Sequence, residues 1–210
     1  MKLYTFPVAP NPTKVRLYLA EKRAGGAGIE VEEVTVRLVD GEQRRPEHLA
    51  RNPFGKLPVL ETERGDFLFE SLPIIDFFEE LHPDPPLFGD TPLSRARARQ
   101  IERLADLGVL IPIARIVHTT RSPLGLPPNP EVAEYFRSQL PAGLDYLDAL
   151  LEDGRSFLAG ERVTVADCTL AAGLHFGRFR ELDFLEGHDR LRAWDERYRA
   201  RPEVEGILLR

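Results

Sequence analysis

The spacing of apolar residues divides the chain into two parts. In the first part, short apolar or alternating segments predict strands at residues 2–6, 29–36, 58–60 and 67–69. The alternation slips by one residue within 29–36, which predicts a β-bulge there. A 3.6-residue period after the first and the last strand predicts helices that begin near Asn11 and Ser71. The order βαβ–ββα indicates a mixed sheet packed against helices.

This order is the layout of the thioredoxin fold, so we expect a thioredoxin-like α/β domain over residues 1–82. Prolines lack an N–H donor and clash with a preceding helical turn, so the proline-rich segment 83–92 is predicted to be a linker. Apolar residues then recur with helical spacing, which predicts an all-α domain over 93–210. Pro112 and Pro141 fall within these helices and are expected to bend them.

Composition narrows the class of protein. Among 210 residues, 42% are hydrophobic and 30% are charged, which excludes a disordered chain. The net charge of −6 argues against a nucleic-acid partner, and no apolar run is long enough to cross a membrane. The first predicted strand begins at residue 2 without a signal-peptide pattern, so we expect a soluble, cytoplasmic protein. The single cysteine, Cys168, excludes an intrachain disulfide, and we expect no metal.

The turn from the first strand into the first helix, Ala9 to Lys14, is the first candidate site. It lies beyond the carboxyl end of a strand, where ligands of α/β sheets bind, and a helix N-terminus favours an anion such as a thiolate. A thioredoxin would carry its reactive cysteines in this turn, but none is present, so a bound small molecule must supply any thiol. Asn11 before Pro12 is also a good helix N-cap, and that structural role stays open beside a chemical one.

Two further segments point to a peptide ligand. If the Leu57–Pro58 bond is cis, the exposed Leu57 backbone could pair with a peptide as an added strand does. Where the last predicted strand meets its helix, Ser71 suits a carboxylate and Glu70 suits an ammonium group. An α-amino acid head carries both groups on one carbon.

With these segments the chain resembles the cytosolic glutathione transferases over nearly its whole length. The most specific matches are the loop 52–60, the run Phe69-Glu70-Ser71, and Thr164-Val165-Ala166-Asp167. The resemblance implies that Leu57 and Pro58 bind the cysteinyl backbone of glutathione and that Glu70 and Ser71 hold its γ-glutamyl head. It also implies that Lys56 and Gln43 lie near the glycyl carboxylate. Glutathione would act as co-substrate, with no tightly bound cofactor.

The catalytic position departs from the common pattern. Several classes of the family carry Ser or Cys where this chain has Ala9, which has no donor. Pro10-Asn11-x-x-Lys14 instead resembles the nu-class pattern Thr-Pro-Asn-Gly-x-Lys, which implies that the Asn11 amide faces the glutathione sulfur. The resemblance also implies a second-substrate pocket, formed by Ala9, Pro10, Leu107, Ile111 and Arg115.

Free energies explain why a donor such as Asn11 is needed. Lowering a thiol pKa from about 8.5 by two units requires about 2.7 kcal/mol. A helix terminus contributes roughly 0.3–1 kcal/mol, whereas a hydrogen bond to a charged group contributes about 1.5–3 kcal/mol. One amide donor would therefore supply most of the difference.

We expect an enzyme that conjugates glutathione to hydrophobic electrophiles, as in detoxification. Two alternatives stay open: a glutathione-dependent disulfide or peroxide reductase, and a non-catalytic interaction module. The resemblance also implies a homodimer, with Phe54 as a hydrophobic contact. By contrast, Thr164-x-x-Asp167 is interpreted as a helix capping box, and Cys168 beside it as a packing residue.

Overall fold

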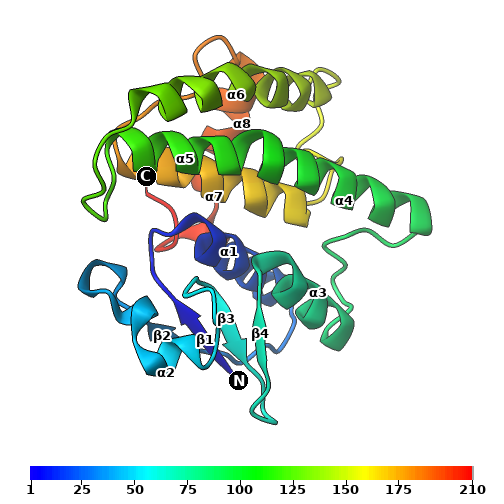
Figure 1. Ribbon diagram of the computed structural model, residues 1–210. Coiled ribbons are helices and arrows are strands. Elements are labelled where there is room, and N and C mark those ends of the chain that lie inside the picture. Colours follow the sequence, from blue (N-terminus) through cyan, green and yellow to red (C-terminus); the bar gives the residue numbers. More distant parts are fainter. Residues whose placement is uncertain (210) are drawn as a thin grey trace. The chain divides into compact units, whose positions relative to one another are not determined.

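The computed structural model describes residues 1–209, and the chain divides into an N-terminal unit, Met1–Pro85, and a helical unit, Pro86–Arg210. The division falls within the predicted segment 83–92. The N-terminal unit has the thioredoxin-like layout and the second unit is helical, so the expected fold class is confirmed (Figure 1).

The N-terminal unit is built on a mixed sheet with the strand order β2-β1-β3-β4. The strands are β1 (Lys2–Thr5), β2 (Glu32–Thr35), β3 (Val59–Glu61) and β4 (Phe67–Phe69). β1 pairs in parallel with β2 and antiparallel with β3, which pairs antiparallel with β4. The predicted bulge is wrong: residues 2–5 pair with residues 32–35 without interruption, and buried Ile29 lies before the strand. Because β1 offers only four residues, β2 is shorter than its alternating pattern.

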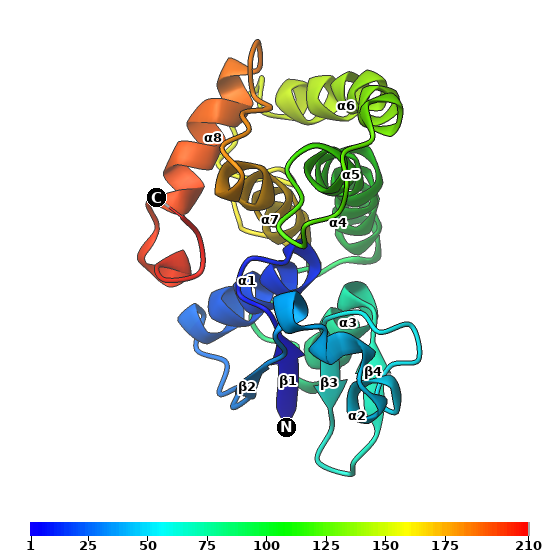
Figure 2. The same ribbon diagram turned by 60° about the vertical axis from the view of Figure 1, so that its left-hand side comes forward.

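Helices α1 (Pro10–Ala24) and α3 (Ser71–Leu81) pack against each other beside the sheet, while the short α2 (Pro46–Leu49) lies apart from them (Figures 1 and 2). The N-cap of α1 lies two residues before the predicted Asn11. Its N-cap is Ala9, with an extended backbone, and Pro10 takes the first helical position, for which its ring presets φ. The N-cap interpretation of Asn11 is therefore wrong.

A buried lysine holds the end of the N-terminal unit in place. Lys22 is 0% exposed, and its Nζ donates to the carbonyl oxygens of His82 at 2.6 Å and Pro85 at 2.7 Å. The same ammonium pairs with Glu79 at 2.7 Å. A buried charge is tolerated only when it is paired and hydrogen-bonded, so these contacts tie residues 82–85 to α1.

The helical unit contains a long helical stretch interrupted by a π-helical turn. Its elements are α4 (Pro92–Ala105), the π turn η3 (Asp106–Leu110), α5 (Ile111–Thr120), α6 (Pro130–Leu150), α7 (Val165–Phe179), α8 (Asp189–Arg199) and the 3₁₀ turn η4 (Pro202–Val204). The wide turn ends just before Pro112, which has no N–H to donate to it. At Gly143 on α6, a Cβ would lie 2.6 Å from the Gly108 carbonyl oxygen, so this close approach requires glycine.

Side chains in the first turn of α7 accept hydrogen bonds from the backbone N–H groups at its start. Thr164 and Asp167 form the predicted capping box. The buried Asp167 carboxylate also accepts hydrogen bonds from the Leu158 N–H at 2.9 Å and from Trp194 Nε1 at 3.2 Å. Burial raises the pKa of Asp167 to about 6, although these donors oppose the rise. Cys168 is buried, as expected, and within residues 1–209 no helix combines the length and apolar character that a membrane span requires.

Candidate functional site

Two predicted site residues are in direct contact in the N-terminal unit. Ser71 Oγ, at the first position of α3, donates a hydrogen bond to Asn11 Oδ1, at the second position of α1, over 3.2 Å. This bond engages the oxygen of the Asn11 amide and leaves the Nδ2 donor at its other end. The sulfur candidate and the head-group candidate therefore belong to one site.

Among the first three residues of α1, only Asn11 carries N–H donors. Pro10 and Pro12 have no N–H, and the Thr13 N–H bonds the Ala9 carbonyl oxygen at 3.0 Å. The backbone N–H and the Nδ2 group of Asn11 have no hydrogen-bond partner within residues 1–209. Any anion at this helix start is therefore stabilised chiefly by one residue.

The turn into α3 has an uncommon backbone. Glu70 is exposed and has φ 71° and ψ 127°, outside the regions that non-glycine residues favour. Such a conformation costs about 1–3 kcal/mol and is concentrated at functional sites. The α3 start has no side-chain cap, so the Ser71 backbone N–H remains suited to a carboxylate, while the Ser71 hydroxyl proton is donated to Asn11.

The register of the sheet brings the remaining candidates to the same edge. Tyr4 pairs with Val59, and Val59 pairs with Phe69. The carboxyl ends of β1 and β4 therefore lie beside the amino end of β3. The turn before α1, the Leu57–Pro58 peptide and the Glu70–Ser71 pair all extend from that edge.

Leu57 presents an unpaired backbone. The Leu57–Pro58 bond is cis, as expected, and neither the N–H nor the carbonyl of Leu57 has a hydrogen-bond partner in the described part of the chain. By contrast, Val59 is paired on both sides within the sheet. An extended peptide could therefore add to the structure at Leu57.

A glycine brings two further segments together. Gly55 has φ 60°, and a Cβ there would lie 2.8 Å from the Gln43 carbonyl oxygen and 3.1 Å from Arg44 Nη1. The 3₁₀ turn η2 (Glu42–Arg44) thus packs against the loop that carries Lys56. Sequence reasoning missed Arg44, although a second cation beside Gln43 was a usable signal. Neither Lys56 nor Arg44 has an ion-pair partner among residues 1–209.

The other second-substrate candidates lie on the helical unit. Leu107, in the π turn, is 56% exposed, Ile111 begins α5 and is half-buried, and Arg115 is exposed one turn later. Burial lowers the pKa of His118 on the same helix, and the Arg115 charge lowers it further. Ala9 and Pro10 begin α1 in the N-terminal unit.

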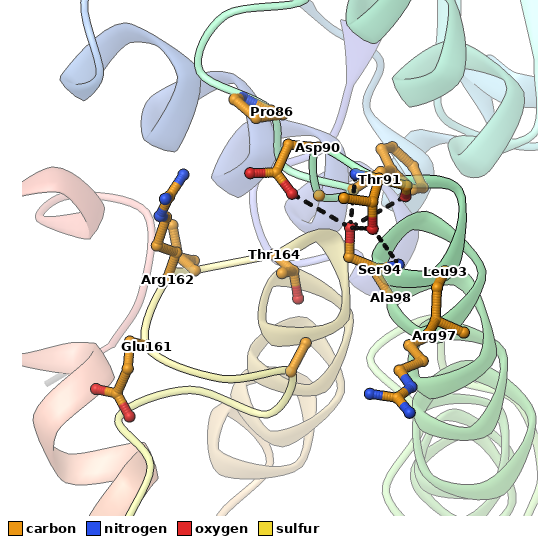
Figure 3. Close-up of a pocket in the computed structure, with 14 residues that line it drawn as sticks. Pro86, Asp90, Thr91, Leu93, Ser94, Arg97, Ala98, Glu161, Arg162 and Thr164 are labelled. Carbon is orange, nitrogen blue, oxygen red and sulfur yellow. Dashed lines mark hydrogen bonds between the residues drawn. The ribbon is translucent and has the colours of Figure 1, made fainter.

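A cavity of about 370 Å³ opens elsewhere, around the start of α4 (Figure 3). Thr91 and Ser94 form a capping box there, in which the side chain of each accepts a hydrogen bond from the backbone N–H of the other. The guanidinium groups of Arg97 and Arg162 point in opposite directions (Figure 3). Because its polar groups do not converge, this cavity lacks the arrangement found at the sheet edge of the N-terminal unit. No cluster of three metal-ligating side chains occurs within residues 1–209.

A thioredoxin-like unit followed by a helical unit is the layout of glutathione-transferase-like proteins. Family models confirm this assignment: residues 3–86 match "Glutathione S-transferase, N-terminal domain" and residues 96–197 match "Glutathione S-transferase, C-terminal domain". The chain belongs to the glutathione S-transferase family.

Similar proteins agree over the full length. Glutathione S-transferase 2 of Saccharomyces cerevisiae is 34% identical over 99% of this chain and 89% of its own length. Glutathione S-transferase GstA of Escherichia coli O157:H7 is 31% identical over 99% of this chain and 97% of its own. The crystal structure of Gtt2 from Saccharomyces cerevisiae has a TM-score of 0.88 and 34% identity, and covers 99% of this chain and 100% of that one. These similarities support a glutathione transferase.

Proposed function

We propose that this glutathione transferase conjugates the glutathione thiolate to hydrophobic electrophiles and that Asn11 stabilises the thiolate. The observation that carries the proposal is the Ser71–Asn11 hydrogen bond, because it engages the oxygen of the Asn11 amide and leaves the Nδ2 group as a donor. The Nδ2 group and the backbone N–H of Asn11 are then the donors for the sulfur.

The free energy of one such hydrogen bond is large enough for this role. A hydrogen bond to a charged group contributes about 1.5–3 kcal/mol, which is roughly one to two units of thiol pKa. The prolines at positions 10 and 12 leave no other N–H in the first three residues of α1 to share the work. This role replaces the Ser or Cys donor that Ala9 lacks.

The rest of glutathione is proposed to bind along the same sheet edge. The Leu57 backbone would pair with the cysteinyl residue, and Pro58 fixes the chain beside it. Glu70 would bind the ammonium group, and the Ser71 backbone N–H would donate to the carboxylate of the γ-glutamyl head. At the other end, Lys56, Gln43 and Arg44 would bind the glycyl carboxylate. The absence of ion-pair partners for the two cations within residues 1–209 supports this end of the site.

The electrophile is proposed to contact apolar groups, with Leu107 and Ile111 as its partners on the helical unit and Arg115 beside them. Ala9 and Pro10 would contribute from the start of α1. The exposure of Leu107, an apolar side chain with no core role, supports this assignment.

A reductase activity is the alternative, in which the glutathione thiolate attacks a disulfide or peroxide. A second glutathione would then release oxidised glutathione from the mixed disulfide, or from the sulfenate formed by a peroxide. The lone cysteine, Cys168, is buried, so both thiols would have to come from glutathione. A third candidate is a non-catalytic interaction module; one relative, 31% identical over 98% of this chain and 90% of its own, has the name FtsZ-localized protein A (Caulobacter vibrioides).

Retention on immobilised glutathione, with elution by free glutathione, separates enzyme from module. We then expect Asn11→Ala to lower kcat/KM for chlorodinitrobenzene by roughly 10- to 100-fold, because a hydrogen bond to a charged sulfur is lost. A parallel assay with a glutathione mixed disulfide separates transferase from reductase. Equal kcat/KM values for Asn11→Ala and the wild type would remove Asn11 from the mechanism.

The matched control is Asn129→Ala. Asn129 caps α6 by accepting the Val132 N–H at 3.1 Å, so this variant should lose about 1 kcal/mol of stability and keep its kcat/KM.

We also propose a cytoplasmic homodimer. Phe54 is 62% exposed and meets Phe69 edge-on at 6.1 Å, which supports a hydrophobic contact with a second copy. Light scattering of the wild type and of Phe54→Ser tests this proposal. A monomer mass for the wild type would contradict it.

A further inference from the structure

The loop before Pro58 is held by two buried side chains that act on one atom. His48 Nε2 and Asn52 Nδ2 each lie 3.1 Å from the Lys56 carbonyl oxygen. Both residues are 2% exposed. Because a carbonyl oxygen only accepts, His48 must carry its proton on Nε2.

Short-range structure aligns the two donors. The Asn52 N–H bonds the His48 carbonyl oxygen at 2.9 Å, which places the residues one helical turn apart at the end of α2. Asn52 Oδ1 accepts the Phe54 N–H at 3.0 Å, so the Asn52 amide is held at both ends. The donors therefore reach the Lys56 oxygen from one side.

The planar peptide between Lys56 and Leu57 fixes the direction of the Leu57 N–H. The Lys56–Leu57 peptide is trans, so its C=O and N–H point in opposite directions. The carbonyl points toward buried His48 and Asn52, and the Leu57 N–H consequently points away from them. That N–H has no partner within residues 1–209.

Hydrogen bonds to a carbonyl also polarise its amide. Each accepted bond strengthens the N–H donor of the same peptide by about 10–30%. With two bonds on the Lys56 oxygen, the Leu57 N–H is both oriented and a stronger donor than an unpaired loop amide.

We propose that His48, together with Asn52, is a positioning residue that aims and strengthens the Leu57 N–H toward the cysteinyl carbonyl of glutathione. This inference rests on the proposed function, since it requires glutathione to pair with Leu57. His48 itself does not touch the ligand. Its effect is on glutathione binding and not on the chemical step.

The test compares His48→Leu, which has no donor, with His48→Gln, whose amide nitrogen can replace Nε2. We expect His48→Leu to raise the KM for glutathione about three- to tenfold with kcat within about twofold, and His48→Gln to restore most of the loss. Asn52→Asp removes the other donor, keeps the acceptor for Phe54, and should raise the KM similarly. His82→Leu is the matched control, because the His82 side chain has no hydrogen-bond partner within residues 1–209.

A spectroscopic measurement separates positioning from a general loss of structure. In the wild type, saturating glutathione should move the Leu57 amide proton downfield in a ¹H–¹⁵N spectrum, with the peak assigned from Leu57→Ile. In His48→Leu at ligand saturation, that movement should be smaller, and in His48→Gln it should return. Each variant's urea midpoint establishes that it is folded. If His48→Leu does not fold, the same comparison is made between Asn52→Asp and the wild type.

An unchanged KM or a full Leu57 shift in His48→Leu would overturn the inference and leave the proposed function standing. A fall in kcat without a rise in KM would also overturn it. If the wild type shows neither retention on glutathione nor a Leu57 shift, the proposed function fails and the inference fails with it.

Discussion

The starts of α1 and α7 present the same physical problem and differ in its solution. Each helix begins with backbone N–H groups that have no partner inside the helix. At α7, Thr164 and Asp167 supply acceptors. The buried Asp167 carboxylate also accepts hydrogen bonds from the Leu158 N–H and from Trp194 Nε1. At α1, the N-cap is Ala9, two of the first three residues are prolines, and the Asn11 N–H is left without a partner in residues 1–209.

A helix start can therefore serve either stability or binding, depending on the residue at its N-cap. An acidic side chain at a helix start satisfies the N–H groups and consolidates the core. An alanine there leaves a donor for an external anion, which is what a glutathione thiolate requires. Substitutions at either helix start test this comparison.

The largest expected effect is on stability at α7. Asp167→Ala leaves the N–H groups of Leu158, Thr164 and Trp194 without their acceptor, so it should lower the free energy of unfolding by about 3–5 kcal/mol. Urea titration followed by the fluorescence of Trp194 measures this loss. A loss below 1 kcal/mol would mean that the capping box is not a main support of the helical unit.

The next effect is a pH dependence at the same residue. Since the pKa of Asp167 is raised from 3.8 to about 6 in the folded protein, its contribution to stability is fully present below about pH 4. That contribution is lost as the pH rises through 6, by at most about 3 kcal/mol. The difference in unfolding free energy between the wild type and Asp167→Asn should therefore shrink from pH 4.5 to pH 7.5. A difference that grows over this range would reverse the sign of the shift.

The smallest effect is expected when an acidic acceptor is introduced at the start of α1, as Asp167 is present at the start of α7. Ala9→Asp supplies an acceptor for the Asn11 N–H and should raise stability by about 0.5–1 kcal/mol. The same carboxylate occupies that donor and places a negative charge beside the sulfur, so glutathione conjugation should fall. Urea unfolding and the chlorodinitrobenzene assay are measured on the same samples, with Ala9→Val as an uncharged control. Higher stability with unchanged activity would separate the α1 start from catalysis.

Local patterns predicted most of the framework. The βαβ–ββα order and the capping box at Thr164 follow from residue types at short spacing, and the structure has both. The cis bond before Pro58, which the residue types alone left open, is also present. The patterns failed at the edges of elements. α1 starts at Pro10 and not after Asn11, because a proline at the first helical position competes with an asparagine N-cap only one residue away.

Other features depended on contacts between distant segments. The π turn ahead of Pro112 gives no distinct hydrophobic period, and Arg44 is noticed only once Gly55 packs against η2. No local pattern marks His48, because its partner is a backbone oxygen eight positions away.

The sequence alone therefore determined which elements form, where the chain divides into a mixed α/β part and a helical part, and which residue types are available for binding a thiol-bearing peptide. The tertiary structure decided how these residues are used. Whether Asn11 caps a helix or presents donors depends on the register of α1 and on Ser71 approaching from α3. Hydrogen-bond direction is a property of atoms brought together by packing, and residue order does not specify it.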